Sequence, residues 1–233
     1  MAEGDLVVER ALDAGCRAVV ALVDADRPPP ITDRLPADVP VYAGGDDVRA
    51  MVTQLGAPQG IVALFARPPR RSATELGDLA TRIVAIEAVD NPINVGSIVR
   101  NAIALGWDGM IFDYTSADPL SRRSLRVSMG QAIGFPAART TSMPDELRRL
   151  VQIGFVVCAL TPSADAGDID SISASARMCI VIGSERAGLS AESLASSTHR
   201  VRIPMAPGVD SLNAAAASAI ACYALRARHT GRG

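Results

Sequence analysis

The chain has 233 residues, of which 48% are hydrophobic and only 3% aromatic, a composition typical of a folded globular protein. Its 23 basic and 25 acidic residues leave a net charge of -2, which excludes a uniformly basic surface for non-specific nucleic-acid binding. All 23 basic residues are arginines, so chemistry that needs a lysine, such as a Schiff base or a P-loop, is excluded as well.

The first 66 residues predict a small α/β module. Apolar runs and helical periodicity predict, in chain order, a helix at 6–14, strands at 18–23 and 39–42, a helix at 46–55 and a strand at 60–65. This part contains 5 arginines and 10 acidic residues, a net charge of -5. A proline pair and three arginines follow at 67–71, and we therefore place a linker over residues 67–78.

Residues 79–233 predict a second α/β domain. The expected elements are strand 82–89, helix 95–105, strand 109–112, helices 120–131 and 144–153, strands 155–160, 178–182 and 200–203, and a long helix from Ser211. The strands are apolar on both faces and are separated by helices. This pattern predicts a parallel sheet that is covered on both sides.

The sequence lacks the residues that membrane spans, metal sites and P-loops require. Apolar runs such as 18–23 have six residues, far below the roughly 20 of a membrane helix, and the acidic start has no apolar signal region, so we expect a cytoplasmic protein. The four cysteines form no C-x-x-C pair and the chain has only two histidines, which predicts free thiols and no metal site. Gly183 and Gly188 have the glycine spacing of a P-loop, but the Lys that should follow is missing.

Polar residues gather in three loops that follow predicted strands. Because the carboxyl ends of parallel strands share one edge of the sheet, where ligands bind, we expect these loops to lie together. The loops span residues 90–101, 183–190 and 204–213. Their candidate catalytic residues are Asn94, Arg100, Glu185, Ser211 and Asn213.

Each candidate also has a simple structural interpretation. Asn94 could cap the helix that follows it, and Asp210 or Ser211 could cap the last helix. Arg100 could be a solvated surface side chain, and Glu185 could interact with a helix dipole. The convergence of all candidates on one edge of one sheet favours a shared site over these separate interpretations.

The three loops resemble the three motifs of the SpoU/TrmH family of RNA ribose 2'-O-methyltransferases, which belongs to the SPOUT superfamily. The first motif, N-x-G-x-x-x-R, corresponds to Asn94, Gly96 and Arg100. The second motif, G-x-E-x-x-G-L, corresponds to Gly183, Glu185, Gly188 and Leu189. The third motif corresponds to Pro204, Met205, Gly208, Ser211, Leu212 and Asn213. Order and spacing agree, and the resemblance extends over residues 82–228.

The resemblance implies an α/β domain at 79–233 with a deep trefoil knot, a homodimer formed through this domain, and S-adenosylmethionine bound in the knot. The residues implied to bind the cofactor are Leu160, Thr161, Gly183, Ser184, Ile203, Met205, Ser211 and Leu212. Residues 1–66 resemble the RNA substrate-binding module of many members. Such members often have an extra segment before the equivalent of residues 2–7, so we expect the natural chain to start upstream.

RNA is expected to contact clustered arginines, because the overall charge is slightly negative. The candidate RNA-binding residues are Arg67, Arg70, Arg71, Arg122, Arg123 and Arg126. Methyl transfer from a sulfonium is an in-line displacement, so the protein mainly positions the ribose hydroxyl and needs no metal. Arg100 is expected to act as a cation rather than as a base, because a guanidinium group is effectively always charged in proteins.

Alternatives stay open at this point. The separate N-terminal module favours ribosomal RNA over transfer RNA as the substrate. The acidic charge of that module gives weight to a non-catalytic accessory protein that binds S-adenosylmethionine or RNA, although intact Arg100, Glu185 and Asn213 favour an enzyme. An antibiotic-resistance type of ribosomal RNA methyltransferase is a third interpretation. The alanine-rich last helix is interpreted either as a buried core helix or as the dimer interface.

Overall fold

The computed structural model describes residues 1–53, 58–173 and 175–227. Contacts divide the chain into two compact units. The first consists of Met1–Pro69 with Leu120–Gly134, and the second of Arg70–Pro119 with Phe135–Gly233. Segment Leu120–Gly134, which was predicted to belong to the second domain at 79–233, therefore packs with the first unit.

The first unit contains a mixed four-stranded sheet in the order β1-β4-β2-β3. Strand β4 is antiparallel to both of its neighbours, and β3 is parallel to β2. The strands are β1 (Ala2–Glu3), β2 (Ala18–Asp24), β3 (Val41–Gly44) and β4 (Ile61–Phe65). The helices are α1 (Asp5–Asp13), α2 (Asp46–Thr53) and α5 (Arg122–Val127), with short 3-10 helices η1 (Pro30–Arg34) and η2 (Gln131–Ile133). The last two positions of the predicted helix 46–55 lie outside the described residues.

The second unit is built on a seven-stranded sheet in the order β7-β6-β5-β10-β8-β11-β9, in which every neighbouring pair is parallel. The strands are β5 (Arg82–Glu87), β6 (Gly109–Asp113), β7 (Ala137–Thr140), β8 (Val156–Leu160), β9 (Gly167–Asp168), β10 (Met178–Gly183) and β11 (His199–Arg202). The helices are α3 (Ala73–Leu79), α4 (Pro92–Ala104), α6 (Met143–Gln152), α7 (Ala191–Ala195) and α8 (Ala214–Ala224), with a 3-10 helix η3 (Ile169–Ser171). The predicted parallel sheet is confirmed, and the trefoil knot stays a prediction.

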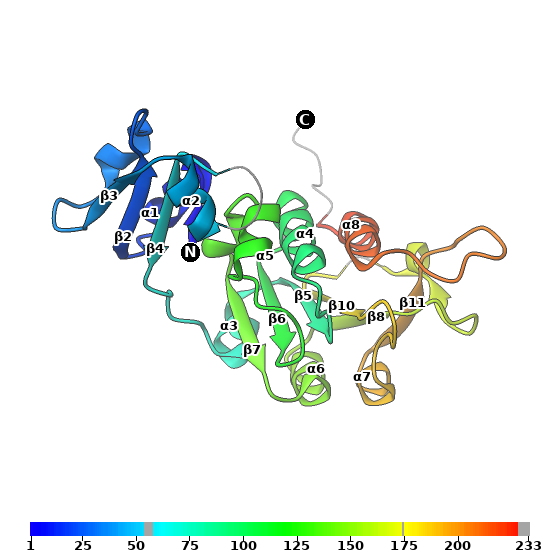
Figure 1. The fold of residues 1–233 in the computed structure, drawn as a ribbon. Coiled ribbons are helices and arrows are strands. Elements are labelled where there is room, and N and C mark those ends of the chain that lie inside the picture. The colour runs from blue at the N-terminus through cyan, green and yellow to red at the C-terminus, as the bar shows by residue number, and fades with distance from the viewer. Residues whose placement is uncertain (54–57, 174, 228–233) are drawn as a thin grey trace, which may run out of the picture. The chain divides into compact units, whose positions relative to one another are not determined.

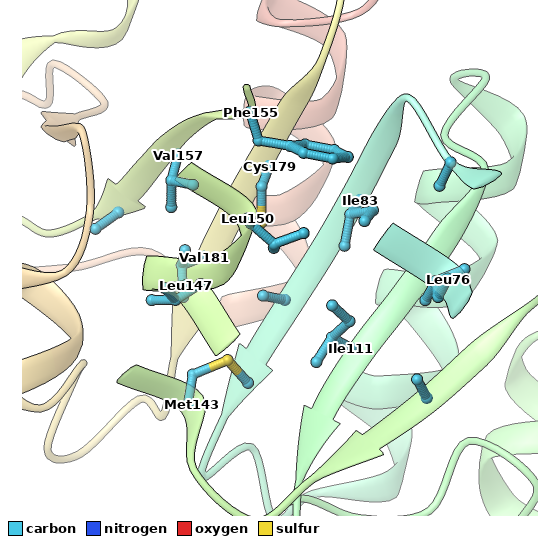
Figure 2. Close-up of a cluster of buried hydrophobic side chains, with 14 of the residues drawn as sticks. Leu76, Ile83, Ile111, Met143, Leu147, Leu150, Phe155, Val157, Cys179 and Val181 are labelled. Carbon is cyan, nitrogen blue, oxygen red and sulfur yellow. The ribbon is translucent and has the colours of Figure 1, made fainter. Parts of the chain in front are cut away.

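Helices cover both faces of this sheet, with α3, α6 and α7 on one face and α4 and α8 on the other (Figure 1). On the first face, Leu76 of α3 and Leu147 and Leu150 of α6 pack in one buried cluster with Ile83 and Ile111 of the sheet (Figure 2). In the described parts of the chain, no helix is long and apolar enough to span a bilayer.

On the second face, helix α4 packs against helix α8. Small residues such as Ala102 and Ala221 are fully buried there and allow the two helices to approach closely. The Nδ2 of Asn101 in α4 donates to the carbonyl oxygen of Ala215 (2.9 Å) and to Ser218 Oγ (2.9 Å) in α8. The start of α8 is thereby fixed to α4, which carries the first motif.

Two predicted helix starts are wrong. Helix α4 begins at Pro92, before the predicted residue 95, because Asn91 caps it by accepting from the backbone N–H of Ile93 at 2.9 Å. Helix α8 begins at Ala214 because its cap is Asn213, so the predicted start at Ser211 and the cap at Asp210 or Ser211 are both wrong.

Two other predicted segments differ for local reasons. Helix α5 ends at Val127, short of the predicted residue 131, since Met129 and Gly130 have φ values of 55° and 81°. Helix α3 occupies the second half of the predicted linker 67–78. It is started by a capping box between Ser72 and Glu75, a signal that is present in the sequence.

Candidate active site

A cavity of about 570 Å³ opens at the carboxyl ends of β8, β10 and β11. All eight residues predicted to bind a cofactor line it, namely Leu160, Thr161, Gly183, Ser184, Ile203, Met205, Ser211 and Leu212. The wall also includes Leu189, Arg186, Asp210, Ala214 and Ala217, which the sequence analysis did not assign to this role. Ala214 and Ala217 lie three residues apart in α8, a helical spacing that could have identified them.

The loop after β10 explains why glycine stands at position 183. Ser184 and Gly188 form an isolated antiparallel bridge, which folds the loop back on itself. A Cβ atom on Gly183 would lie 2.3 Å from the backbone carbon of Gly188 and 2.5 Å from the backbone nitrogen of Leu189. Both obstacles are backbone atoms, so no side chain can be accommodated without moving the loop that forms the cavity wall.

Three of the candidate catalytic residues form one hydrogen-bonded cluster. Asn94 Nδ2 donates to Glu185 Oε1 at 3.0 Å, and Asn213 Nδ2 donates to the same oxygen at 2.5 Å and to Asn94 Oδ1 at 3.1 Å. The backbone N–H of Ala214 donates to Glu185 Oε1 as well, at 3.3 Å. Three donors thus hold one carboxylate oxygen, and Oε2 accepts no hydrogen bond from the described residues.

Each motif contributes one member to this cluster. Asn94 lies in the first turn of α4, Glu185 lies in the loop after β10, and Asn213 caps α8. Asn213 has two roles, since its Oδ1 accepts from the backbone N–H groups of Ala215 (2.9 Å) and Ala216 (3.3 Å) while its Nδ2 holds Glu185. The interpretation of Asn94 as the cap of α4 is wrong, because Asn91 has that role.

The other two catalytic candidates lie outside the cluster. Ser211 is exposed and lines the cavity. Arg100 lies six residues after Asn94 on α4, is exposed, and makes no hydrogen bond or ion pair with any described residue of its own chain. It is not among the residues that line the cavity.

A further carboxylate, Glu87, was missed by the sequence analysis. It ends strand β5 and accepts hydrogen bonds from the backbone N–H (3.0 Å) and Oγ (3.0 Å) of Ser190 and from Ser193 Oγ (2.8 Å). This network ties the end of the second motif to the sheet and starts α7. A charged residue at the end of an otherwise apolar strand was the available signal.

The candidate RNA-binding arginines differ in their contacts. In the first unit, Arg122 Nε donates to Glu3 Oε1 at 2.6 Å, while Arg123 is exposed. In the second unit, Arg70 forms an ion pair with Asp118 at 2.5 Å. Arg67, Arg71 and Arg126 are exposed.

Comparisons with known proteins place this geometry in a family. Residues 81–223 match the model of the SpoU rRNA Methylase family. The chain belongs to this family. It is 39% identical over 228 residues to the uncharacterized tRNA/rRNA methyltransferase Rv0881 of Mycobacterium tuberculosis, which covers 96% of this chain and 79% of the relative.

Two further SpoU relatives cover nearly the whole chain. The 23S rRNA (guanosine(2553)-2'-O)-methyltransferase RlmP of Bacillus subtilis is 29% identical over 225 residues, or 96% of this chain and 87% of RlmP. The AdoMet-bound rRNA methyltransferase of Sinorhizobium meliloti is 28% identical and has a TM-score of 0.84, with 96% of this chain and 85% of that chain covered.

The cavity of this SpoU family member fits a ligand of the size and polarity of S-adenosylmethionine. Its volume of about 570 Å³ lies in the range of small-molecule sites, roughly 300 to 1,000 Å³. Leu160, Ile203 and Leu212 give it apolar walls, and Asp210 and Glu185 supply carboxylates. Within residues 1–53, 58–173 and 175–227, no group of three or more His, Cys, Asp or Glu side chains could hold a metal ion.

Proposed function

We propose that this protein transfers a methyl group from S-adenosylmethionine to a ribose 2'-hydroxyl of structured RNA, with ribosomal RNA favoured over transfer RNA. The observation that carries the proposal is the cavity lined by residues of the second and third motifs. The cluster of Asn94, Glu185 and Asn213 unites all three motifs. The name of RlmP, a 23S rRNA 2'-O-methyltransferase, supports the substrate class.

The residues that line the cavity have distinct roles in this proposal. The apolar side chains of Leu160, Ile203 and Leu212 would hold the adenosine, and backbone groups of Gly183 and Ser184 would orient it. S-adenosylmethionine, when bound, supplies an electrophilic methyl group on a sulfonium.

Glu185 and Arg100 would act on the ribose. Glu185 keeps Oε2 free of partners among the described residues, so this oxygen can accept a hydrogen bond from a water molecule that in turn accepts the 2'-hydroxyl proton, which orients the hydroxyl for in-line attack. Arg100 would act as a preorganised cation that stabilises the developing alkoxide, while water or a phosphate oxygen takes the proton.

Arg100 does not reach the cavity of its own chain, and we therefore propose a homodimer, formed through the second unit, whose sites draw residues from both chains. The exposed apolar side chains Ile220 and Tyr223 of α8 support an interface on this helix. The first unit would contact the RNA through arginines such as Arg123. Such an enzyme would work in the cytoplasm, where its RNA substrates are made.

The proposal is tested by methyl transfer to defined RNA pools. Purified protein is incubated with isotopically labelled S-adenosylmethionine and with ribosomal or transfer RNA from a strain that lacks this protein, and the RNA is digested to nucleosides. We expect label in a 2'-O-methylnucleoside from ribosomal RNA, and a loss of label with Glu185→Gln. Binding of cofactor and RNA without any transfer would favour the accessory-protein alternative and overturn the proposal.

A further inference from the structure

An aromatic and cationic cluster lies at the carboxyl ends of β6 and β7, beside the first motif. The guanidinium carbon of Arg139 is 4.8 Å from the ring centroid of Phe112 and 5.1 Å from that of Tyr114. Phe112 is fully buried, whereas Tyr114 is 63% exposed. Arg139 therefore packs against both a buried ring and an exposed one, so that the exposed ring is supported by the sheet.

The backbone around Tyr114 is fixed by its neighbours. Asp113 Oδ1 accepts from the backbone N–H of Ser116 at 2.9 Å and from that of Ala88 at 3.1 Å. Ser116 Oγ accepts in turn from the backbone N–H of Val89 at 3.0 Å. These bonds join the turn that carries Tyr114 to the loop that leads into α4, so the turn is held at the edge of the sheet where Asn94 lies.

Local charge argues against a phosphate site at this position. The Arg70 guanidinium pairs with Asp118 at 2.5 Å, and Arg139 lies 3.9 Å from the same carboxylate. The one carboxylate pairs closely with Arg70 and lowers the positive potential around both cations, which weakens their attraction for a phosphate. An exposed, rigidly backed tyrosine ring is instead suited to stacking, which costs little ordering entropy when the ring is already fixed.

We propose that Tyr114, backed by Arg139, is a stacking platform for an unpaired nucleobase of the RNA that flanks the methylated nucleotide. The inference deepens the proposed function and rests on it. Stacking on an aromatic ring tolerates every base and adds affinity for single-stranded RNA. Tyr114 would therefore act as a positioning residue, which selects targets in loops or bulges over targets in continuous duplex.

The test compares substitutions at position 114 that keep or remove the aromatic ring. Tyr114→Phe and Tyr114→Trp keep an aromatic ring, Tyr114→Leu keeps an apolar side chain without one, and Tyr114→Ala removes both. Binding is measured by fluorescence anisotropy with a labelled oligoadenylate and with protein-free ribosomal RNA. We expect Phe and Trp to stay close to the wild-type affinity and Leu and Ala to lose roughly fivefold to a hundredfold.

A spectroscopic measurement and a matched control variant distinguish the loss of stacking from a general loss of structure. The natural Trp107 is buried, so quenching of the new indole of Tyr114→Trp by oligoadenylate would report base contact directly. Leu79→Ala removes another exposed apolar side chain of the second unit and should leave RNA affinity unchanged. S-adenosylmethionine affinity and the unfolding midpoint should be the same in all variants.

Each result has one meaning. Wild-type affinity in Tyr114→Leu and Tyr114→Ala, or an unquenched indole in Tyr114→Trp, overturns the platform while the methyltransferase proposal stands. A wild-type protein that binds neither S-adenosylmethionine nor RNA overturns the proposed function, and the platform with it.

Discussion

The two units use similar apolar strands in different ways. In the second unit the sheet is covered on both faces, and the side chains of Ile83, Val84, Ala85 and Ile86 in β5 are all fully buried. In the first unit Val19 and Leu64 of the sheet and Val48 of α2 stay exposed, and residues 1–66 carry a net charge of -5. The second unit can therefore hold three loops in fixed positions. The first presents a partly apolar surface, and its segment 120–134 adds three arginines and no acidic residue, so that its nine arginines nearly balance its ten acidic residues. This difference supports the proposal that the second unit carries the chemistry and that the first contacts the RNA.

The largest effect is expected at Gly183, where backbone atoms of the same loop leave no space for a side chain. Gly183→Ala places a Cβ atom 2.3 Å from backbone of Gly188, so the cavity wall must move and S-adenosylmethionine affinity should fall more than roughly a hundredfold. Gly106→Ala is the matched control, since its φ of +76° makes alanine strained but no atom lies within 4 Å. It should cost about 1 to 2 kcal/mol of stability and leave cofactor affinity unchanged. Normal cofactor binding by Gly183→Ala would contradict binding of the cofactor in this cavity.

The next effect concerns Arg100, which has no hydrogen-bond or ion-pair partner among the described residues of its own chain. Arg100→Ala should lower the single-turnover methyl-transfer rate roughly a hundredfold or more, while Arg100→Lys keeps part of the rate because the charge remains. If Lys is as inactive as Ala while RNA and cofactor still bind, simple charge cannot explain the role of Arg100.

Mixed dimers tell whether Arg100 acts across subunits. Arg100→Ala and Glu185→Ala chains, each inactive alone, are mixed under conditions that exchange subunits. A shared site predicts that activity returns, because one site of the mixed dimer then holds an intact Arg100 and an intact Glu185. A mixture as inactive as its components would show that both residues must come from the same chain.

A smaller effect is expected from the first unit. Arg123→Ala removes an exposed arginine and should lower the slope of RNA affinity against salt by about one without loss of stability. Arg34→Ala is the control, because Arg34 already pairs with Glu9 (3.2 Å) and Asp13 (2.6 Å). A slope that is unchanged by Arg123→Ala but lowered by Arg34→Ala would show that RNA uses another surface of this unit.

The smallest effect is expected in the labelling rates of the cysteines, which report how well each unit buries its thiols. Burial raises the pKa of the Cys158 thiol to about 12 and raises the pKa of half-buried Cys16 as well. Since the thiolate is the reactive form, an uncharged maleimide should label Cys16 slowly, and faster as the pH rises, and should label the buried Cys158, Cys179 and Cys222 only after unfolding. Rapid labelling of several thiols in the native protein would show that the second unit opens readily.

Much of the fold followed from local patterns. The strands of the parallel sheet were predicted because their apolar runs reflect burial on both faces. The cofactor residues were predicted from the resemblance to the SpoU/TrmH family, and all of them line the cavity. Helix starts were less accurate, since Asn91, Asn94, Ser211 and Asn213 are all suitable caps and only the three-dimensional contacts decide among them.

Other features depend on contacts between distant segments and were not visible in the sequence. The packing of Leu120–Gly134 with the first unit is one example, since nothing local distinguishes this segment from the rest of its domain. The three donors that converge on Glu185 Oε1 come from residues 28 to 91 positions away, which no spacing rule predicts. Arg100 shows the converse, because a match to the motif did not bring its side chain to the cavity of its own chain.

Titration of the purified protein with S-adenosylmethionine by calorimetry, in the presence of EDTA, tests the central claim most directly. The account predicts saturable binding without a metal, since the cavity offers apolar walls, backbone groups and two carboxylates. It also predicts that Gly183→Ala abolishes the signal while Gly106→Ala keeps it. Absence of binding by the wild-type protein at millimolar cofactor would contradict the account, because a methyltransferase must bind its methyl donor.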